Sequence, residues 1–193
     1  MLSYKESLKI LKDTNALIEG HFILSSGLHS PQYVQCAQLL SKPDKAKLIC
    51  SSLSEKIHKE FPKIDLILSP AMGGIIIGYE IGRLLNLETI FSERVNSVFS
   101  LRRDFKIPKD SKVLIMEDVI TTGKSSLECS ELVTASNSEV VGFGCIIDRS
   151  NGKSKLKKKI VSQLEINIPT FEKDSLPDNL KKLKAVKPGS RGI

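Results

Sequence analysis

The chain has 193 residues, of which 40% are hydrophobic and 26% are charged, and its formal net charge is +7. This composition is ordinary for a globular protein, and a chain of this length buries a sufficient core without disulfides or structural metals. The positive charge fits a nucleic acid, a membrane surface or a small polyanion as partner and does not choose among them.

The cysteines and the apolar runs indicate which class of protein this is and where it is located. None of the four cysteines forms a C-x-x-C pair, and no apolar run approaches the roughly 20 residues that cross a membrane. The first residues form a charged amphipathic stretch, which is not typical of a signal peptide. We therefore expect no membrane partner and a reducing, cytoplasmic location.

The first part of the chain predicts one helix and two strands. Apolar residues within 4–18 recur at helical spacing, and Gly20 is expected to stop that helix. Residues 21–24 and 32–35 are expected to be short strands on either side of a turn rich in Ser, Gly and Pro.

Residues 40–150 predict a doubly wound α/β core. Short apolar strands without polar alternation are separated by helices, which is typical of a mostly parallel sheet with helices on both faces. The expected strands lie at 65–69, 88–91, 112–116 and 139–147, and the expected helices at 42–60, 75–85 and 123–134. Residues 94–108 are expected to be irregular.

The last part of the chain is more polar and strongly basic. The expected elements there are a solvated turn at 150–159, a strand at 160–168 and a short helix at 177–183. We interpret residues 1–193 as one domain. Its two ends, about 1–40 and 150–193, are expected to pack together as a small hood on the core.

The segment from Glu117 to Ser125 carries the most informative chemistry. Ligands of open α/β sheets bind at the carboxyl ends of strands, and here Glu117 and Asp118 follow a buried strand. A hydroxyl pair, Thr121 and Thr122, then precedes a predicted helix N-terminus, where backbone N–H groups bind phosphate. Carboxylates accept hydrogen bonds, so the acidic pair suits sugar hydroxyls or the waters of Mg²⁺. This spacing predicts a site for a ribose 5-phosphate.

Two other interpretations of this segment are weaker. Gly123, Lys124 and Ser125 resemble the end of a P-loop, but the first glycine of that motif would fall at Asp118, whose charge would lie against nucleotide phosphates. Simple helix capping accounts for one carboxylate at the loop. It does not account for two adjacent carboxylates before an apolar pair and a second hydroxyl pair.

The run from Glu117 to Gly123 resembles the phosphoribosyl pyrophosphate (PRPP) motif of type I phosphoribosyltransferases. Other segments, in the expected order, are similar to orotate phosphoribosyltransferases in particular. These are Gly20 to Pro31, Ser69 to Ile75 with Gly78 to Glu80, Glu93 and Arg94 with Leu101 to Phe105, Ile147 to Ser150, and Lys187 to Arg191.

The resemblance implies a type I phosphoribosyltransferase core and a specific reaction. Ribose 5-phosphate would pass from PRPP to N1 of orotate, giving orotidine 5′-monophosphate and pyrophosphate in UMP biosynthesis. Mg²⁺ would be required and held mostly by PRPP. The enzyme would be a homodimer with a mobile loop shared between subunits, and no nucleic acid or membrane would be its partner.

The same resemblance implies roles for particular residues. PRPP binding falls to Arg94, Glu117, Asp118, Val119, Ile120, Thr121, Thr122, Gly123, Lys124 and Ser125. Catalysis falls to Asp118, Arg94, Arg102 and Arg103, and Asp118 would also face the metal, mainly through water. Orotate binding falls to Thr121, Arg149 and Tyr33.

Three positions depart from the family pattern. Lys124 stands where a second glycine is usual, Ser25 stands where some members carry a lysine, and Val95 to Ser100 lacks the lysines and histidine common in the mobile loop. Two other functions remain open at this point. One is a phosphoribosyltransferase for a purine base, and the other is a PRPP-sensing regulator that binds nucleic acid.

Overall fold

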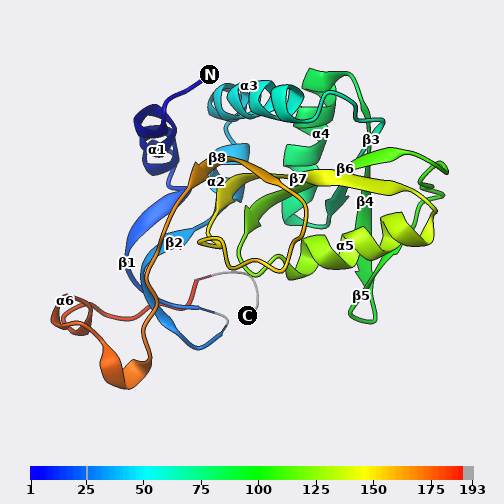
Figure 1. The fold of residues 1–193 in the computed structure, drawn as a ribbon. Coiled ribbons are helices and arrows are strands. Elements are labelled where there is room, and N and C mark those ends of the chain that lie inside the picture. Colours follow the sequence, from blue (N-terminus) through cyan, green and yellow to red (C-terminus); the bar gives the residue numbers. More distant parts are fainter. Residues whose placement is uncertain (25, 189–193) are drawn as a thin grey trace.

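The computed structural model describes residues 1–24 and 26–188 (Figure 1). Ser25 and the residues Gly189 to Arg191 of the tail, both considered above, lie outside the described residues. Within them, no helix is long and apolar enough to span a membrane.

A six-stranded sheet lies at the centre of the molecule, in the order β5-β4-β3-β6-β7-β8. Every neighbouring pair is parallel except the hairpin formed by β4 and β5. Its strands are β3 (Leu66–Pro70), β4 (Glu88–Val95), β5 (Val98–Leu101), β6 (Lys112–Ile120), β7 (Glu139–Asp148) and β8 (Ile160–Glu165).

Helices cover both faces of this sheet. Helices α3 (Pro43–Glu60) and α4 (Gly73–Leu85) lie on one face, and α5 (Lys124–Ala135) lies on the other (Figure 1). Successive side chains of a strand point to opposite faces of its sheet, and those of β6 do so. Leu114 packs in the core under α3 and α4, whereas Ile115 packs in the core under α5. The prediction of a doubly wound, mostly parallel sheet is confirmed.

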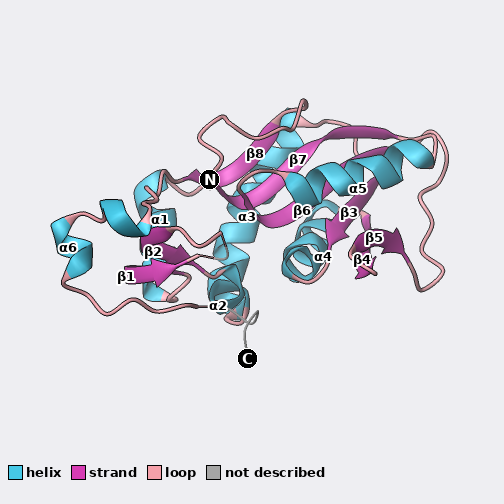
Figure 2. Cartoon of the chain, turned by 90° about the horizontal axis from the view of Figure 1, so that it is seen from below, coloured by secondary structure: helices cyan, strands magenta, loops and turns pink. Residues whose placement is uncertain are grey.

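The first and last described elements lie together beside the sheet (Figure 2). The elements there are α1 (Tyr4–Asp13), β1 (Leu17–Ile23), β2 (His29–Val34), α2 (Cys36–Leu40), the 3₁₀ helix η1 (Lys173–Ser175) and α6 (Asp178–Lys181). β1 and β2 form an antiparallel pair, and isolated bridges join Phe22 to Val186 and His29 to Phe171. These bridges tie the last part of the described chain to the β1–β2 pair and support our interpretation of a hood.

The predicted helix at 4–18 is too long. A capping box between Ser3 and Glu6 starts α1, but the helix ends at Asp13. Asn15 then adopts a left-handed conformation with φ of 58°, which redirects the chain into β1 at Leu17. The short helix α2, which follows β2 directly, was not predicted.

The strands near the site are longer than predicted. Residues 94–108, expected to be irregular, contain the end of β4 and all of β5. Asn96 and Ser97 join these strands with φ of 49° and 68°, the left-handed pair that a tight hairpin turn requires. β6 continues past its predicted end at Met116 to Ile120, so the acidic pair lies within the strand and not after it.

Candidate active site

The ends of β6 and β7 form the floor of the candidate site. The backbone N–H of Arg149 donates to the carbonyl oxygen of Ile120 at 2.8 Å, immediately beyond the last paired residues of both strands. This bond fixes the residue predicted to bind orotate beside the start of residues 121–125, which we call the 5-phosphate loop. The structure thus brings together two parts of the site that lie far apart in sequence.

Asp118 lies at the junction of three elements. Its Oδ1 accepts the backbone N–H of Val119 at 2.8 Å, and its carbonyl oxygen lies 3.9 Å from Cys36 Sγ at the start of α2. A Cβ atom on Gly73 would come within 2.7 Å of Asp118 Oδ1, so only glycine lets the N-terminus of α4 approach this closely. This requirement explains the glycine at position 73, which the sequence showed only as part of a loop.

The acidic pair is half-buried, and this changes its protonation. Burial, with the neighbouring Asp118 charge as a smaller cause, raises the pKa of Glu117 to about 9. Burial also raises the pKa of Asp118 above its usual range. A cation or hydroxyl donors beside the pair would reverse this effect, because both favour the ionised carboxylates.

The same pair fits a magnesium ion held mainly by substrate. Among the described residues, no three His, Cys, Asp or Glu side chains form a group that would hold a metal by themselves. Mg²⁺ commonly keeps several waters and is bound by one or two carboxylates together with substrate phosphates. Glu117 and Asp118 are carboxylates of the kind that such a site uses.

Glu117 is expected to make the ligand-free protein less stable at alkaline pH. Because its pKa rises from 4.5 to about 9, its contribution to stability is fully present below about pH 4.5 and is lost as the pH rises through about 9. One pKa unit corresponds to about 1.4 kcal/mol, and partial solvent access reduces the effect, so we expect a loss of about 1–3 kcal/mol relative to Glu117→Gln. Urea unfolding at a series of pH values measures it, and identical pH profiles for the two proteins would contradict it.

The 5-phosphate loop has the geometry of an anion site. Gly123 is the N-cap of α5 with φ of 76°, and the first turn of that helix carries no acidic residue. Thr121 and Thr122 are exposed, Ser125 is half-buried, and the N-terminal backbone N–H groups of this 12-residue helix add a favourable dipole. Hydroxyl and N–H donors therefore converge where the sequence predicted a phosphate.

The side chains of Val119 and Ile120 point to opposite faces of the sheet. The Ile120 side chain is buried in the core under α5, whereas Val119 packs against the core on the other face. The Ile120 side chain is therefore not available to a ligand, whereas the Val119 side chain is half-buried. The PRPP-binding role of both residues stays a prediction.

Lys124 and Arg94 share one counter-ion that the sequence analysis missed. Arg94 Nη2 lies 2.7 Å from Glu128 Oε2, and the exposed Lys124 Nζ lies 3.9 Å from Glu128 Oε1. The spacing of four residues between Lys124 and Glu128 on a helix is a signal that was present in the sequence. The approach of Arg94 comes from the fold and has no sequence signal.

The arginines of the β4–β5 hairpin differ in their surroundings. Arg94 also donates to the carbonyl oxygen of Ser97 at 2.6 Å, and its guanidinium lies 4.0 Å from the centre of the Phe99 ring. Arg103 forms a bidentate salt bridge with Glu93, in which Nε donates to Oε2 at 2.9 Å and Nη2 donates to Oε1 at 3.0 Å. Arg102 is exposed and has no ion pair within the described part of the chain.

Arg149 is half-buried directly after β7. Its Nε is buried and has no hydrogen-bond partner among the described residues, and burial lowers the pKa of this guanidinium, which remains charged. Buried unpaired donors are uncommon in folded proteins and need an explanation. A planar carboxylate ligand, which accepts two parallel bonds from arginine, provides one.

Tyr33 lies in β2 of the hood. Its ring packs on the Phe22 ring, with 5.7 Å between the ring centres. Tyr33 also lies three residues before Cys36, whose Sγ contacts the Asp118 carbonyl oxygen. This puts Tyr33 on the hood side of the acidic pair. Its role beside the base stays a prediction.

Comparison with known proteins places these features in a family. Residues 35–175 match the family model of the phosphoribosyl transferase domain. The orotate phosphoribosyltransferase of Parvibaculum lavamentivorans is 44% identical over 193 residues, which is 100% of both chains. That of Caldicellulosiruptor bescii is 46% identical over 184 residues, covering 95% of this chain and 96% of the relative.

Solved structures support the fold. The orotate phosphoribosyltransferase of Aeropyrum pernix matches with a TM-score of 0.73 at 23% identity, covering 82% of this chain and 92% of that one. An adenine phosphoribosyltransferase from Thermoanaerobacter pseudethanolicus matches with a TM-score of 0.62 at 16% identity, over 70% and 88% of the two chains. The fold is therefore shared by enzymes named for different bases, and the full-length sequence identity is what separates them. The chain belongs to the phosphoribosyltransferase family and, within it, to the orotate phosphoribosyltransferases.

Proposed function

We propose that this protein transfers ribose 5-phosphate from PRPP to orotate, giving orotidine 5′-monophosphate and pyrophosphate in UMP biosynthesis. The observation that carries the proposal is the 2.8 Å bond between the Arg149 N–H and the Ile120 carbonyl oxygen. It holds the backbone of Arg149, whose guanidinium is suited to the orotate carboxylate, next to a loop suited to the 5-phosphate of PRPP.

Each part of the substrates has a matching part of the site. The 5-phosphate would bind the N-terminus of α5, with Thr121, Thr122 and Ser125 adding hydroxyl donors. Glu117 and Asp118 would accept hydrogen bonds from the ribose hydroxyls. Thr121 and Tyr33 would lie beside the base, whose carboxylate would pair with Arg149.

The reaction needs positioning and charge stabilisation more than acid–base chemistry. The transition state resembles an oxocarbenium ion, so the ribose ring gains positive charge while pyrophosphate departs with negative charge. The carboxylates of Glu117 and Asp118 would stabilise that positive charge. Mg²⁺, bound mostly by PRPP and reached by Asp118 through water, would neutralise part of the pyrophosphate charge.

The hairpin arginines would stabilise the departing pyrophosphate. Arg94 and Arg103 are paired with Glu128 and Glu93, so each would exchange a carboxylate for a pyrophosphate oxygen when the hairpin closes over the substrates. Arg102, which is exposed, would reach the same oxygens without losing an ion pair. The absence of lysines from this hairpin leaves these arginines as its cations.

Turnover with a panel of bases tests this function. The purified protein, given PRPP and Mg²⁺, is expected to consume orotate and not adenine, hypoxanthine or uracil. Product formation with a purine alone would overturn the assignment. Salt-sensitive binding of RNA or DNA without any orotate turnover would favour a regulatory protein instead.

An exposed apolar stripe on α4 supports a homodimer. Met72, Ile76 and Tyr79 are 82%, 53% and 65% exposed and follow one another at helical spacing beside the start of α4. Contiguous exposed apolar side chains of this kind commonly mark a protein interface. A dimer through this face would allow the β4–β5 hairpin to serve the partner's site.

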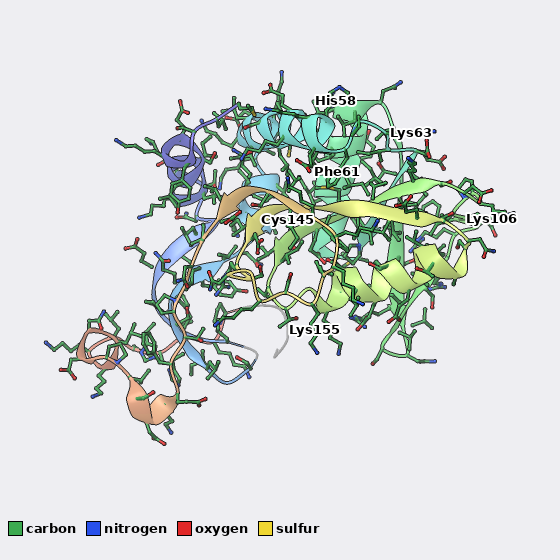
Figure 3. All side chains as sticks on the ribbon, viewed as in Figure 1. His58, Phe61, Lys63, Lys106, Cys145 and Lys155 are labelled. Atoms are coloured by element: carbon green, nitrogen blue, oxygen red, sulfur yellow. The ribbon has the colours of Figure 1, made fainter. Side chains whose placement is uncertain are left out.

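Replacing Tyr79 with glutamate is expected to produce monomers. Burying a charge within the apolar stripe opposes association, whereas the wild type is expected to be dimeric by light scattering. His58→Glu is the control, because His58 is exposed on α3 and not on α4 (Figure 3). A dimeric Tyr79→Glu protein, or a monomeric wild type, would refute the proposed interface.

A cytoplasmic location is consistent with the cysteines. Cys36, Cys50, Cys129 and Cys145 are all buried free thiols. Disulfides are rare in the reducing cytoplasm, so this use of cysteine supports our placement of the protein there.

A further inference from the structure

The loop that follows Arg149 carries exposed lysines and also packs one side chain against the core. Residues 150–159, which we call the basic loop, were expected to form a solvated turn. Their lysines are indeed exposed, but Leu156 is half-buried and belongs to the core under α5. Figure 3 shows Lys155 on this loop, beside the beginning of α5.

Two contacts bind the basic loop to the 5-phosphate loop. The backbone N–H of Lys155 donates to the carbonyl oxygen of Thr122 at 3.3 Å. The Leu156 side chain lies against Gly123, because a Cβ atom built on Gly123 would meet Leu156 Cγ at 2.8 Å. Gly123 is therefore required for two separate reasons, its φ of 76° and the presence of Leu156.

The contacts of Lys155 and Leu156 lie on the flank of the 5-phosphate loop that makes no hydrogen bond to α5. On the helix side, the Leu127 N–H donates to the Gly123 carbonyl oxygen at 2.8 Å, which fixes one flank. On the other flank Thr121 and Thr122 are exposed, and Lys155 and Leu156 supply the contacts described above. Leu156 is the side chain that packs against Gly123 on this flank.

We propose that Leu156 is a positioning residue for the 5-phosphate loop, holding its backbone in the orientation that binds the phosphate of PRPP. This inference rests on the proposed function, since it concerns the same substrate. Leu156 would touch neither PRPP nor orotate. It acts through Gly123 and Thr122.

The effect of Leu156 should be selective for PRPP. Arg149 is anchored independently by its bond to Ile120, and the Asp148 carboxylate accepts the Ser150 N–H at 2.7 Å. Loss of the Leu156 side chain leaves both anchors in place. Orotate binding should therefore survive a change that loosens the phosphate loop.

Leu156 also lies beside a pocket next to α5. The side chain also walls a cavity of about 370 Å³ between α5 and the basic loop, whose other apolar walls include Leu127, Val140 and Phe143. Truncation at position 156 would join this cavity to the surface of Gly123 and admit water there.

Steady-state kinetics of Leu156→Ala test the proposal. We expect the KM for PRPP to rise by about tenfold and the KM for orotate to stay within about twofold of the wild type, because only the phosphate cradle is displaced. Leu156→Met should restore most of the affinity, and Leu156→Val, which is shorter, should fall between the two. Calorimetric titration with PRPP alone gives the same comparison without a base.

Leu132→Ala is the matched control. Leu132 is half-buried in the same core, near the far end of α5. Its truncation should lower the thermal stability as much as Leu156→Ala does and leave both KM values unchanged. The proposal is overturned if Leu156→Ala leaves the KM for PRPP unchanged, raises both KM values equally, or behaves like Leu132→Ala. Failure of the proposed function would appear separately, as a wild type that does not convert orotate.

Discussion

Replacing Asp118 with asparagine is expected to lower kcat by about a hundredfold or more, an effect of the size seen when one electrostatic contact to a transition state is removed. The carboxylate lies near the end of β6 against the N-terminus of α4. We propose that the ribose, which gains positive charge in the transition state, binds beside it. Asparagine keeps the shape and removes the charge. Initial rates at saturating PRPP and orotate measure the loss.

Asp65→Asn is the matched control for this change. Asp65 accepts the backbone N–H of Lys112 at 2.8 Å, so it holds the opposite end of the same strand. The Asp65→Asn variant should be slightly less stable than the wild type and should have the same kcat. An Asp118→Asn enzyme with unchanged kcat would remove the acidic pair from the mechanism.

Replacing Arg149 with alanine is expected to raise the KM for orotate by about a hundredfold, because charge-assisted hydrogen bonds contribute about 1.5–3 kcal/mol. The KM for PRPP should change little, since the 5-phosphate loop has its own contacts. Kinetics with each substrate varied in turn separate the two effects. An unchanged KM for orotate would show that the carboxylate binds elsewhere.

Two further variants sharpen the test of Arg149. Arg149→Lys keeps the charge but loses the planar fork, so it should fall between the wild type and Arg149→Ala. Lys12→Ala is the control, because the exposed Lys12 of α1 pairs with Glu19 at 2.8 Å, outside the proposed site and the proposed interface. It should leave the KM for orotate unchanged.

The sheet and the position of the site could be predicted because they depend on local patterns. Apolar strands without polar alternation indicated a parallel sheet, and such a sheet delivers its loops to one edge. The acidic pair and the hydroxyl pair of residues 117–125 then lay at that edge. The bond between Arg149 and Ile120 follows directly from this arrangement.

The errors arose where short-range patterns were ambiguous. Residues 14–18 continue the helical spacing of α1, but short apolar runs fit helix and strand equally well, and Asn15 turns the chain. The hairpin at Asn96 and Ser97 was missed because its turn has no glycine, although asparagine tolerates the left-handed conformation. Neither error moved the predicted site.

The contacts between side chains could not be predicted from the sequence. Glu128 pairs with Arg94 across 34 positions of the chain, and Leu156 reaches Gly123 only because the basic loop turns back at Asn151 and Gly152. Such contacts depend on how loops from different strands meet. They decide which predicted cations are available to a ligand, and they alter the interpretation of Lys124, which faces Glu128.

A crystal structure of this protein with orotidine 5′-monophosphate bound tests the central assignment most directly, because the product carries both groups that the site is proposed to recognise. The 5′-phosphate is expected within about 3 Å of the backbone N–H groups of residues 121–125, with the base carboxylate paired to the Arg149 guanidinium. A product whose phosphate lies away from the N-terminus of α5, or whose carboxylate faces another residue, would contradict it.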